Sequence, residues 1–348
     1  MHPAKRLFFV SLGILALAVA FPLGARSARD QGGTVQQLTT PEAWCQDAYP
    51  TFSPNGSQVA FFRFGPAAGE MSLMVADVPS GATAVLVAGS QLLSNMAAGG
   101  GIEWSPDGAY IAICGETTND GSEIWLVDMV GAPIRQLTTP PSGCSDAYPS
   151  FSPNGSQIAF YRLNGVAGGS NLMVADVSSG AATVLVPGSQ LPSSGEGGGI
   201  EWSPGGSYIA ICGSPAAGRS EIWLVDMGGM VQQLTTPPSG CGDAYPTFSP
   251  NGSQVAFFRF GPAAGEMSLM VADVPSGATT VLVPGSQLPS DMAASGGIEW
   301  SPDGSYIVLC GRASTGQGIG LALWLADVVG PPIQTTPTTW GRIKAERR

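Results

Sequence analysis

Short apolar runs, separated by turn residues, follow one another along the whole chain of 348 residues. Runs such as "SQVAFF", "AYIAIC", "LMVADV", "EIWLVDM" and "TVLV" are rich in β-branched and aromatic residues, and Gly, Pro, Asn or Asp punctuates them. Runs of this length and composition between turn signals are typical of β-strands rather than helices. The pattern therefore predicts an all-β protein built from many short strands.

The strands recur in two alternating modules. "CQDAYPTFSPNGSQVAFFR" starts at Cys45 and has close copies at Cys144 and Cys241, while "GIEWSPDGAYIAICG" starts at Gly101 and has copies at Gly199 and Gly297. The tryptophans of the second module recur every 98 residues, at Trp104, Trp202 and Trp300. Residues 47–83 and 243–279 are identical, which indicates recent duplication of a two-module unit.

Each module is predicted to contain four strands. The first ends in Phe or Trp and is followed by "SPNG", "SPDG" or "SPGG", in which Pro fixes φ and Asn-Gly or Asp-Gly supplies a hairpin turn. Periodicity alone also permits a sandwich or a solenoid. Four strands in each repeat of about 40–50 residues are the pattern of propeller blades.

The combination "SPDG…YIAICG…EIWLVDM…QLTT" resembles the WD-like repeat of the TolB-type β-propeller family, over residues 33–336. The resemblance implies a six-bladed propeller. It is weak for function, because such propellers serve many roles. The periplasmic family member of the Tol–Pal envelope system carries an extra N-terminal α/β domain, for which this sequence has no room.

The start of the array predicts how the ring closes. "GGTVQQLTT", residues 32–40, matches the fourth strand of other modules but has no module of its own. Val35–Thr39 is therefore expected to complete the last blade beside Leu321–Val328, which would remove an exposed sheet edge. The expected fold is a six-bladed β-propeller of four-stranded antiparallel blades, made of three tandem copies of a two-blade unit of about 98 residues.

The ends of the chain differ from the repeats. Lys5 and Arg6 precede an apolar stretch, Leu7–Phe21, which contains small residues for cleavage at Ala18 and Ala20. This is the pattern of a signal peptide over residues 1–28, with an uncleaved membrane anchor as the alternative. Residues 337–348 form a basic C-terminal tail. The protein is expected to be secreted, periplasmic or at the cell surface, with no membrane insertion beyond the leader.

The repeats themselves are acidic. The net charge is −11, and residues 33–340 contain 6 Arg, no Lys and 23 acidic residues. An acidic domain of this kind repels nucleic acid and anionic lipid, and it tolerates cations or a basic partner. Nucleic acid is therefore excluded as a partner, and a monomer is expected.

Six cysteines suggest disulfides, because an exported protein lies where they persist. Cys45, Cys144 and Cys241 precede the odd modules, and Cys114, Cys212 and Cys310 end the second strands of the even modules. Propeller geometry favours the pairs Cys114–Cys144, Cys212–Cys241 and Cys310–Cys45. The set Cys45–Cys114, Cys144–Cys212 and Cys241–Cys310 stays open. Zinc is disfavoured, since no CxxC pair exists.

Histidine chemistry is excluded from the repeats, because the single histidine is His2 in the leader. A Ser-His-Asp triad is thus ruled out, and no nucleophile elbow, Walker loop or dinucleotide fingerprint occurs. No catalytic residue is predicted. Chemistry that uses only carboxylates or a bound metal stays open.

The candidate binding residues come in threefold sets. Asp47, Asp146 and Asp243 begin innermost strands, and Arg63, Arg162 and Arg259 end the adjacent strands on the same face; an Asp–Arg pair within each blade is the simpler interpretation. Glu103, Glu201 and Glu299 precede the core tryptophans and each needs a partner, either an arginine of a neighbouring blade or a cation such as calcium in the channel. Tyr49, Tyr148 and Tyr245 are expected near the same opening, for packing or for ligand contact.

These features favour an exported TolB-like propeller that acts as a non-catalytic scaffold for a protein, peptide or glycan. No cofactor is required by this hypothesis. The alternative is a carbohydrate-active enzyme, a lyase or hydrolase, that uses channel carboxylates and a bound metal. A purely structural envelope or surface protein is the third hypothesis.

Overall fold

The structure is a computed structural model. It describes residues 34–67, 70–92, 101–118, 121–129, 134–164, 169–192, 199–214, 219–263, 265–289, 297–315 and 318–328. All of these lie in one compact unit, Gly32–Arg348. The predicted leader and the basic tail lie outside the described residues. Within the described part, no helix is long and apolar enough to span a bilayer.

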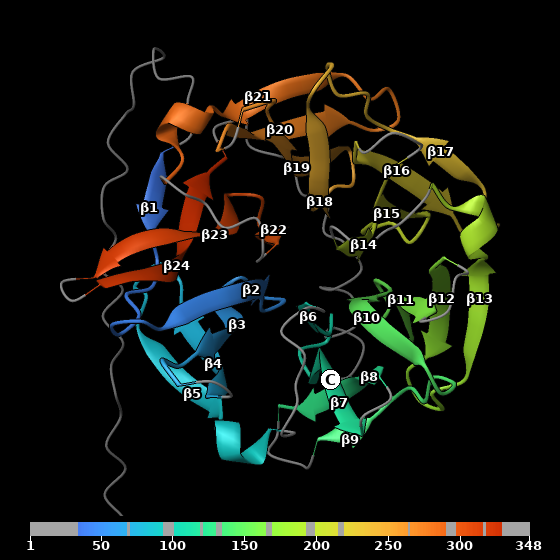
Figure 1. Ribbon diagram of the computed structural model, residues 1–348, viewed down its shortest axis with the longest axis horizontal. Coiled ribbons are helices and arrows are strands. Elements are labelled where there is room, and N and C mark those ends of the chain that lie inside the picture. The colour runs from blue at the N-terminus through green and yellow to red at the C-terminus, as the bar shows by residue number, and fades with distance from the viewer. Residues whose placement is uncertain are drawn as a thin grey trace, which may run out of the picture. The chain divides into compact units, whose positions relative to one another are not determined.

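Antiparallel sheets dominate the described residues and surround a common centre (Figure 1). Four of the sheets have four strands each. Their strands are β6 (Ile102–Trp104), β7 (Tyr110–Thr118), β8 (Gly121–Asp128) and β9 (Arg135–Gln136); β10 (Cys144–Phe151), β11 (Gln157–Asn164), β12 (Asn171–Asp176) and β13 (Ala182–Val186); β14 (Ile200–Trp202), β15 (Tyr208–Gly213), β16 (Glu221–Asp226) and β17 (Val231–Gln233); β18 (Gly242–Phe248), β19 (Gln254–Phe260), β20 (Met267–Asp273) and β21 (Thr279–Val283).

A fifth, eight-stranded sheet contains both ends of the repeat array. Its strands are β2 (Gln46–Phe52), β3 (Gln58–Phe64), β4 (Met71–Asp77) and β5 (Thr83–Val87), together with β22 (Ile298–Trp300), β23 (Tyr306–Thr315), β24 (Gly318–Asp327) and β1 (Val35–Gln37). A single parallel pair, Gln46 with Leu321, joins these two groups of four. Strand β1 pairs antiparallel with β24, with Val35 opposite Ala326.

A short 3₁₀ helix follows the fourth strand of each odd module along the chain. These helices are η1 (Gly89–Gln91), η2 (Gly188–Gln190) and η3 (Gly285–Gln287). The hairpin between β2 and β3 shows why "SPNG" recurs. The Ser53 hydroxyl donates to Asn55 Oδ1, and the Gly56 N–H donates to the Ser53 carbonyl oxygen at 2.8 Å. Gly56 has a φ of 69°, a conformation that glycine adopts at little cost. The predicted turn is therefore confirmed at this hairpin.

The hydrophobic core lies between neighbouring groups of four strands, which are the four separate sheets and the two halves of the eight-stranded sheet. Phe52 and Phe61 pack with Leu323 and Leu325 in one cluster, and five equivalent clusters lie between the other neighbours among the described residues. Each sheet is thus covered on both faces, which explains why its strands are almost continuously apolar. The fold is all-β and propeller-like, as predicted.

Candidate functional site

The innermost strands β2, β10 and β18 are each interrupted by a bulge at a Tyr-Pro dipeptide. In β10, regular pairing with β11 stops after Ala147 and resumes at Ser150. Proline has no N–H to donate to the neighbouring strand, so the pairing cannot continue through it. The preceding tyrosines adopt a left-handed conformation that is unusual for a bulky residue. Their φ values are 57° for Tyr49, 56° for Tyr148 and 58° for Tyr245.

Three glutamates on β6, β14 and β22 reach across to the next sheet. The Phe151 N–H donates to Glu103 Oε2 at 3.0 Å, and the Phe248 N–H donates to Glu201 Oε1 at 3.1 Å. The third link is between the two ends of the array, where the Phe52 N–H donates to Glu299 Oε2 at 3.0 Å. The expected alternative, a neighbouring arginine as the glutamate's partner, is wrong, because every one of those arginines binds an aspartate in its own sheet.

The residue after each Tyr-Pro pair makes the complementary link to the other neighbour. The Trp104 N–H donates to Thr51 Oγ1 at 3.1 Å, and the Trp202 N–H donates to Ser150 Oγ at 2.9 Å. The Trp300 N–H donates to Thr247 Oγ1 in the same way. Together with the glutamate contacts, these bonds connect the six innermost strands into a continuous belt, which holds the glutamates in place.

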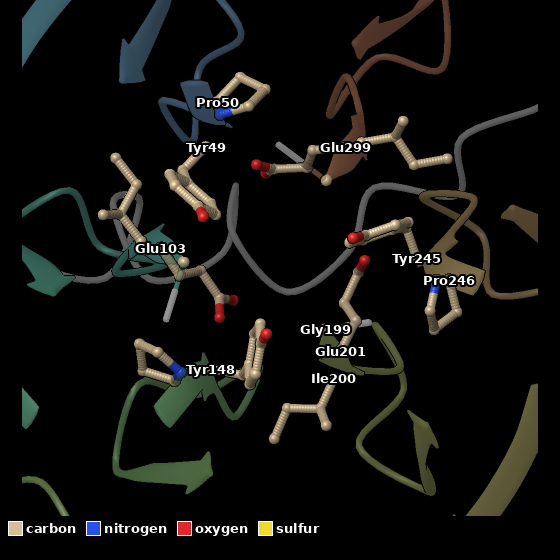
Figure 2. Close-up of a pocket in the computed structure, with 15 residues that line it drawn as sticks. Tyr49, Pro50, Glu103, Tyr148, Gly199, Ile200, Glu201, Tyr245, Pro246 and Glu299 are labelled. Atoms are coloured by element: carbon tan, nitrogen blue, oxygen red, sulfur yellow. The ribbon is translucent and has the colours of Figure 1, made fainter. Parts of the chain in front are cut away.

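The tyrosines and glutamates share one central pocket of about 120 Å³. Figure 2 shows their hydroxyls and carboxylates directed into this pocket, tyrosine and glutamate alternating around it. The lining is threefold, with one Tyr-Pro pair and one Gly-Ile-Glu segment from each repeat. The lining residues are Tyr49, Pro50, Gly101, Ile102, Glu103, Tyr148, Pro149, Gly199, Ile200, Glu201, Tyr245, Pro246, Gly297, Ile298 and Glu299.

The electrostatics of the pocket are set by its three carboxylates, because none of the described residues that line it is a Lys, Arg or His. Burial raises the pKa of Glu201 to about 8. Burial also raises the pKa values of Glu103 and Glu299 well above their usual range, and the neighbouring carboxylates add to the effect. Each glutamate nevertheless keeps some exposed surface, because one side of it faces the pocket. At neutral pH the carboxyl groups of these glutamates therefore favour the protonated form.

The aspartate and arginine sets form three ion pairs within the odd sheets and do not line the central pocket. In each pair the arginine donates two hydrogen bonds to one carboxylate; from Arg162 Nε and Nη2 to Asp146 they measure 2.7 and 2.8 Å. The aspartates are fully buried. The arginines also lie over phenylalanine rings, Arg162 at 5.6 Å from the Phe160 ring centre. The structure therefore brings together tyrosine and glutamate in one place, and aspartate and arginine in another.

All six cysteines lie among the described residues, and no disulfide joins any two of them, so neither predicted set of pairs is present. Cys114 instead hydrogen-bonds the Tyr148 backbone. Tyr148 is four residues along β10 from Cys144, which is about 13 Å in an extended strand. Bridged cysteines need Cα atoms within about 7 Å. Burial raises the pKa of Cys114, Cys212 and Cys310 to about 12.

Within the described residues, no three acidic, histidine or cysteine side chains come close enough to hold a metal ion together. The prolines, glycines and isoleucines that complete the pocket wall were not among the residues predicted from the sequence. A signal was present for the prolines, because a Tyr-Pro dipeptide inside an apolar strand cannot pair regularly.

The arrangement defines a class of protein, a β-propeller with a small polar pocket at its centre. The chain belongs to the TolB β-propeller domain family, which matches residues 28–274. A TolB homolog from Chlorobium chlorochromatii is 31% identical over 135 residues, which cover 39% of this chain and 28% of that protein.

Solved structures are similar in fold. TolB from Acinetobacter baumannii matches with a TM-score of 0.59 at 20% identity, over 79% of this chain and 64% of that one. An oligogalacturonate lyase in complex with manganese matches with a TM-score of 0.56 at 14% identity, over 84% and 93% of the two chains. This chain therefore spans less than two thirds of both TolB relatives, and the structural matches concern the fold alone.

Proposed function

We propose that the chain is an exported six-bladed propeller that acts as a non-catalytic scaffold and binds a protein, peptide or glycan at its central pocket. The observation that carries this proposal is the convergence of six polar side chains, from all three repeats, on one pocket. Ligand pockets are typically concave sites with a few convergent polar groups. The buried Asp–Arg pairs would hold the odd blades rigid beneath it.

The six-bladed architecture is supported by the contacts between the two ends of the array. Strand β1 pairs with β24, and the Leu38 N–H donates to the Leu323 carbonyl oxygen at 2.7 Å, as Leu137 does to Ile124 within an internal sheet. In our proposal, β1 is the fourth strand of the sixth blade. The leader pattern supports a secreted, periplasmic or cell-surface location, and we propose a monomer.

Peptide and glycan arrays probed with the purified chain test the proposed function. Ligands captured by the wild-type chain should bind at least about tenfold more weakly to a Tyr148→Asn variant, which removes a pocket ring. Asparagine tolerates the left-handed conformation, so the backbone should be kept. The matched control is Val184→Ser, at an exposed position on outer strand β13. Capture that survives Tyr148→Asn unchanged, or no capture at all, would contradict the proposal.

The second candidate is a carbohydrate-active enzyme, and one observation favours it. A carboxyl group with a pKa of about 8, as in Glu201, can act as a general acid near neutral pH. The fold is also similar to that of an oligogalacturonate lyase. Turnover of a glycan panel, with and without manganese, distinguishes this candidate from the scaffold. Activity that Glu201→Gln abolishes would replace the scaffold proposal.

A further inference from the structure

A second groove lies in the first repeat and shares no lining residue with the central pocket. Its volume of about 670 Å³ is in the range of small-molecule binding sites. The segment before β2 forms part of its wall, and the loop that joins β3 to β4 forms another part. We call it the first-repeat groove, and its lining includes Glu42, Cys45, Arg63, Pro66, Glu70 and Met71.

Trp44 lies in the chain between two residues that line this groove, Glu42 and Cys45. It is 63% exposed, so it contributes little to the hydrophobic core. Its φ of 66° is a left-handed conformation that is unfavourable for a bulky residue. Glycine occupies the equivalent positions of the other repeats, with φ values of 78° at Gly143 and 88° at Gly240. An exposed tryptophan in a strained conformation points to a functional role.

The third repeat provides an internal reference for this groove. Residues 47–83 and 243–279 are identical, and every lining residue of the groove except Glu42 has an identical counterpart in the third repeat. The segment before the first strand differs, because it reads "PEAWC" over residues 41–45 and "PPSGC" over residues 237–241. The first-repeat groove is therefore distinguished by a carboxylate and an indole.

The same comparison locates the Trp44 side chain relative to the groove. A Cβ atom on Gly240 would lie 3.0 Å from the Cβ atom of Pro262. Pro262 is the counterpart of Pro66, which lines the first-repeat groove. The Trp44 side chain therefore leaves the backbone at the groove wall, where it adds an exposed aromatic surface.

The polar groups of the groove include both donors and acceptors. Arg63 donates from Nε and Nη2 to Asp47, and a guanidinium has five N–H donors, so further donors remain for the groove. The Ser72 hydroxyl accepts a backbone N–H at 3.2 Å and has a hydrogen of its own to donate. The carboxylates of Glu42 and Glu70 are acceptors. This combination suits a ligand whose hydroxyl groups both donate and accept.

A sugar ring combines such hydroxyl groups with an apolar C–H face that can pack against an indole. An anionic sugar is disfavoured by the two carboxylates of the groove. A small cation would fill little of the volume and would leave the donors of Arg63 without acceptors.

We propose that the first-repeat groove binds a neutral glycan, with one ring stacked on Trp44 and its hydroxyl groups bound to Glu42, Glu70 and Arg63. This site goes beyond the proposed function, which concerns the central pocket.

The test is a fluorine NMR titration of the full chain, labelled with 5-fluorotryptophan, in which the Trp44 signal is the one that a Trp44→Gly variant lacks. The probes are maltose, cellobiose, lactose and diacetylchitobiose. At least one of them should shift the Trp44 signal saturably, with a dissociation constant in the millimolar range. Digalacturonate and tetramethylammonium, an anionic and a cationic probe, should bind at least about tenfold more weakly.

Trp44→Gly should lower the affinity for the bound disaccharide at least about tenfold, as measured by calorimetry. Glycine adopts the left-handed conformation readily, so the fold should be kept. The matched control is Val184→Ser, at an exposed position on β13, which should bind as the wild type does. Unchanged affinity of Trp44→Gly, no binding of any of the four disaccharides, or equal or tighter binding of digalacturonate or tetramethylammonium would each overturn the inference.

A variant with Pro238→Glu, Ser239→Ala and Gly240→Trp gives the third repeat the segment of the first. It should bind two disaccharides where the wild type binds one, because the rest of the groove lining is the same in both repeats. A folded variant that still binds one disaccharide would overturn the assignment of the site to this segment. If this variant does not fold, the comparison of Trp44→Gly with the wild type decides the inference.

These outcomes are separable from those of the proposed function, because the titration follows Trp44 and the central pocket is tested through Tyr148. A disaccharide that shifts the Trp44 signal, while the arrays capture no ligand that depends on Tyr148, would keep the groove and overturn the scaffold proposal. Array capture that Tyr148→Asn weakens, without binding of any disaccharide at Trp44, would keep the scaffold proposal and overturn the groove.

Discussion

Asp47, Asp146 and Asp243 are buried completely, and each is held by two hydrogen bonds from an arginine. Planar guanidinium and carboxylate groups fit each other in this two-point geometry. The partners face each other across adjacent strands, as Asp146 is opposite Arg162 in the β10–β11 register. At the residue scale, the offset of 16 positions between these aspartates and arginines is thus a consequence of hairpin pairing.

Removing one partner of such a pair should be costly. Asp146→Ala should lower the free energy of unfolding by about 3 kcal/mol, because Arg162 would be left largely buried without its carboxylate. Urea denaturation measures the effect. The matched control is Asp176→Ala, at an exposed turn where the side chain accepts hydrogen bonds from Ser178 and Ser179. This change should lower the free energy of unfolding by less. Equal losses for the two variants would contradict this explanation.

At the element scale, strand β1 pairs with β24, and the segment after it binds the same strand. Thr39 Oγ1 accepts the Leu323 N–H at 3.0 Å, as Thr138 accepts that of Ile124 and Thr235 that of Ile222. The first segment adds one contact, because the Thr39 hydroxyl also donates to Asp47 Oδ2 at 2.7 Å. This contact ties the start of the array to the ion pair of the first odd sheet.

Thr39→Val should therefore destabilise the protein more than Thr138→Val. The first change leaves the Leu323 N–H unsatisfied and removes a donor from Asp47, for a loss of about 2 kcal/mol. The second leaves one N–H unsatisfied, for a loss of about 1 kcal/mol. Thermal and urea unfolding of both variants measure the difference. If Thr138→Val proves the more harmful, β1 is less important for stability than its contacts indicate.

At the scale of the whole molecule, the glutamates become a group only because three sheets bring them to one pocket. Glu201 accepts from the Phe248 N–H and interacts with Thr247, and the carboxylates of Glu103 and Glu299 face it across the pocket. Burial and mutual repulsion both oppose ionisation. The folded state therefore binds protons that the unfolded chain has released.

This difference predicts a pH dependence of stability. The Glu201 pKa rises from an ordinary 4.5 to about 8 on folding, so its stabilising contribution is complete below pH 4.5 and is lost as the pH rises through 8. Between these values the wild type should lose on the order of 4 kcal/mol relative to the Glu201→Gln variant. Urea denaturation across this pH range measures the difference, and parallel profiles for the two proteins would contradict it.

The amino-acid sequence by itself determined the strands, the turns and the repeat. Apolar runs bounded by Ser-Pro-Asn-Gly and its variants specify local conformation, and local conformation depends on neighbours in the chain. The sequence also showed that Asp146 and Arg162 could pair, because two strands of one hairpin have a predictable register. Chain pattern alone sufficed wherever the interacting residues belong to one hairpin.

Only the tertiary structure decided what the three repeats do together. Glu103 binds the Phe151 backbone of the next sheet, and the Tyr-Pro bulges direct Tyr49, Tyr148 and Tyr245 toward one centre. These contacts depend on how the sheets are arranged about the centre, which no local pattern encodes. For the same reason the cysteines could not be paired from their spacing, since the distance of Cys144 from Cys114 depends on the direction in which β10 runs.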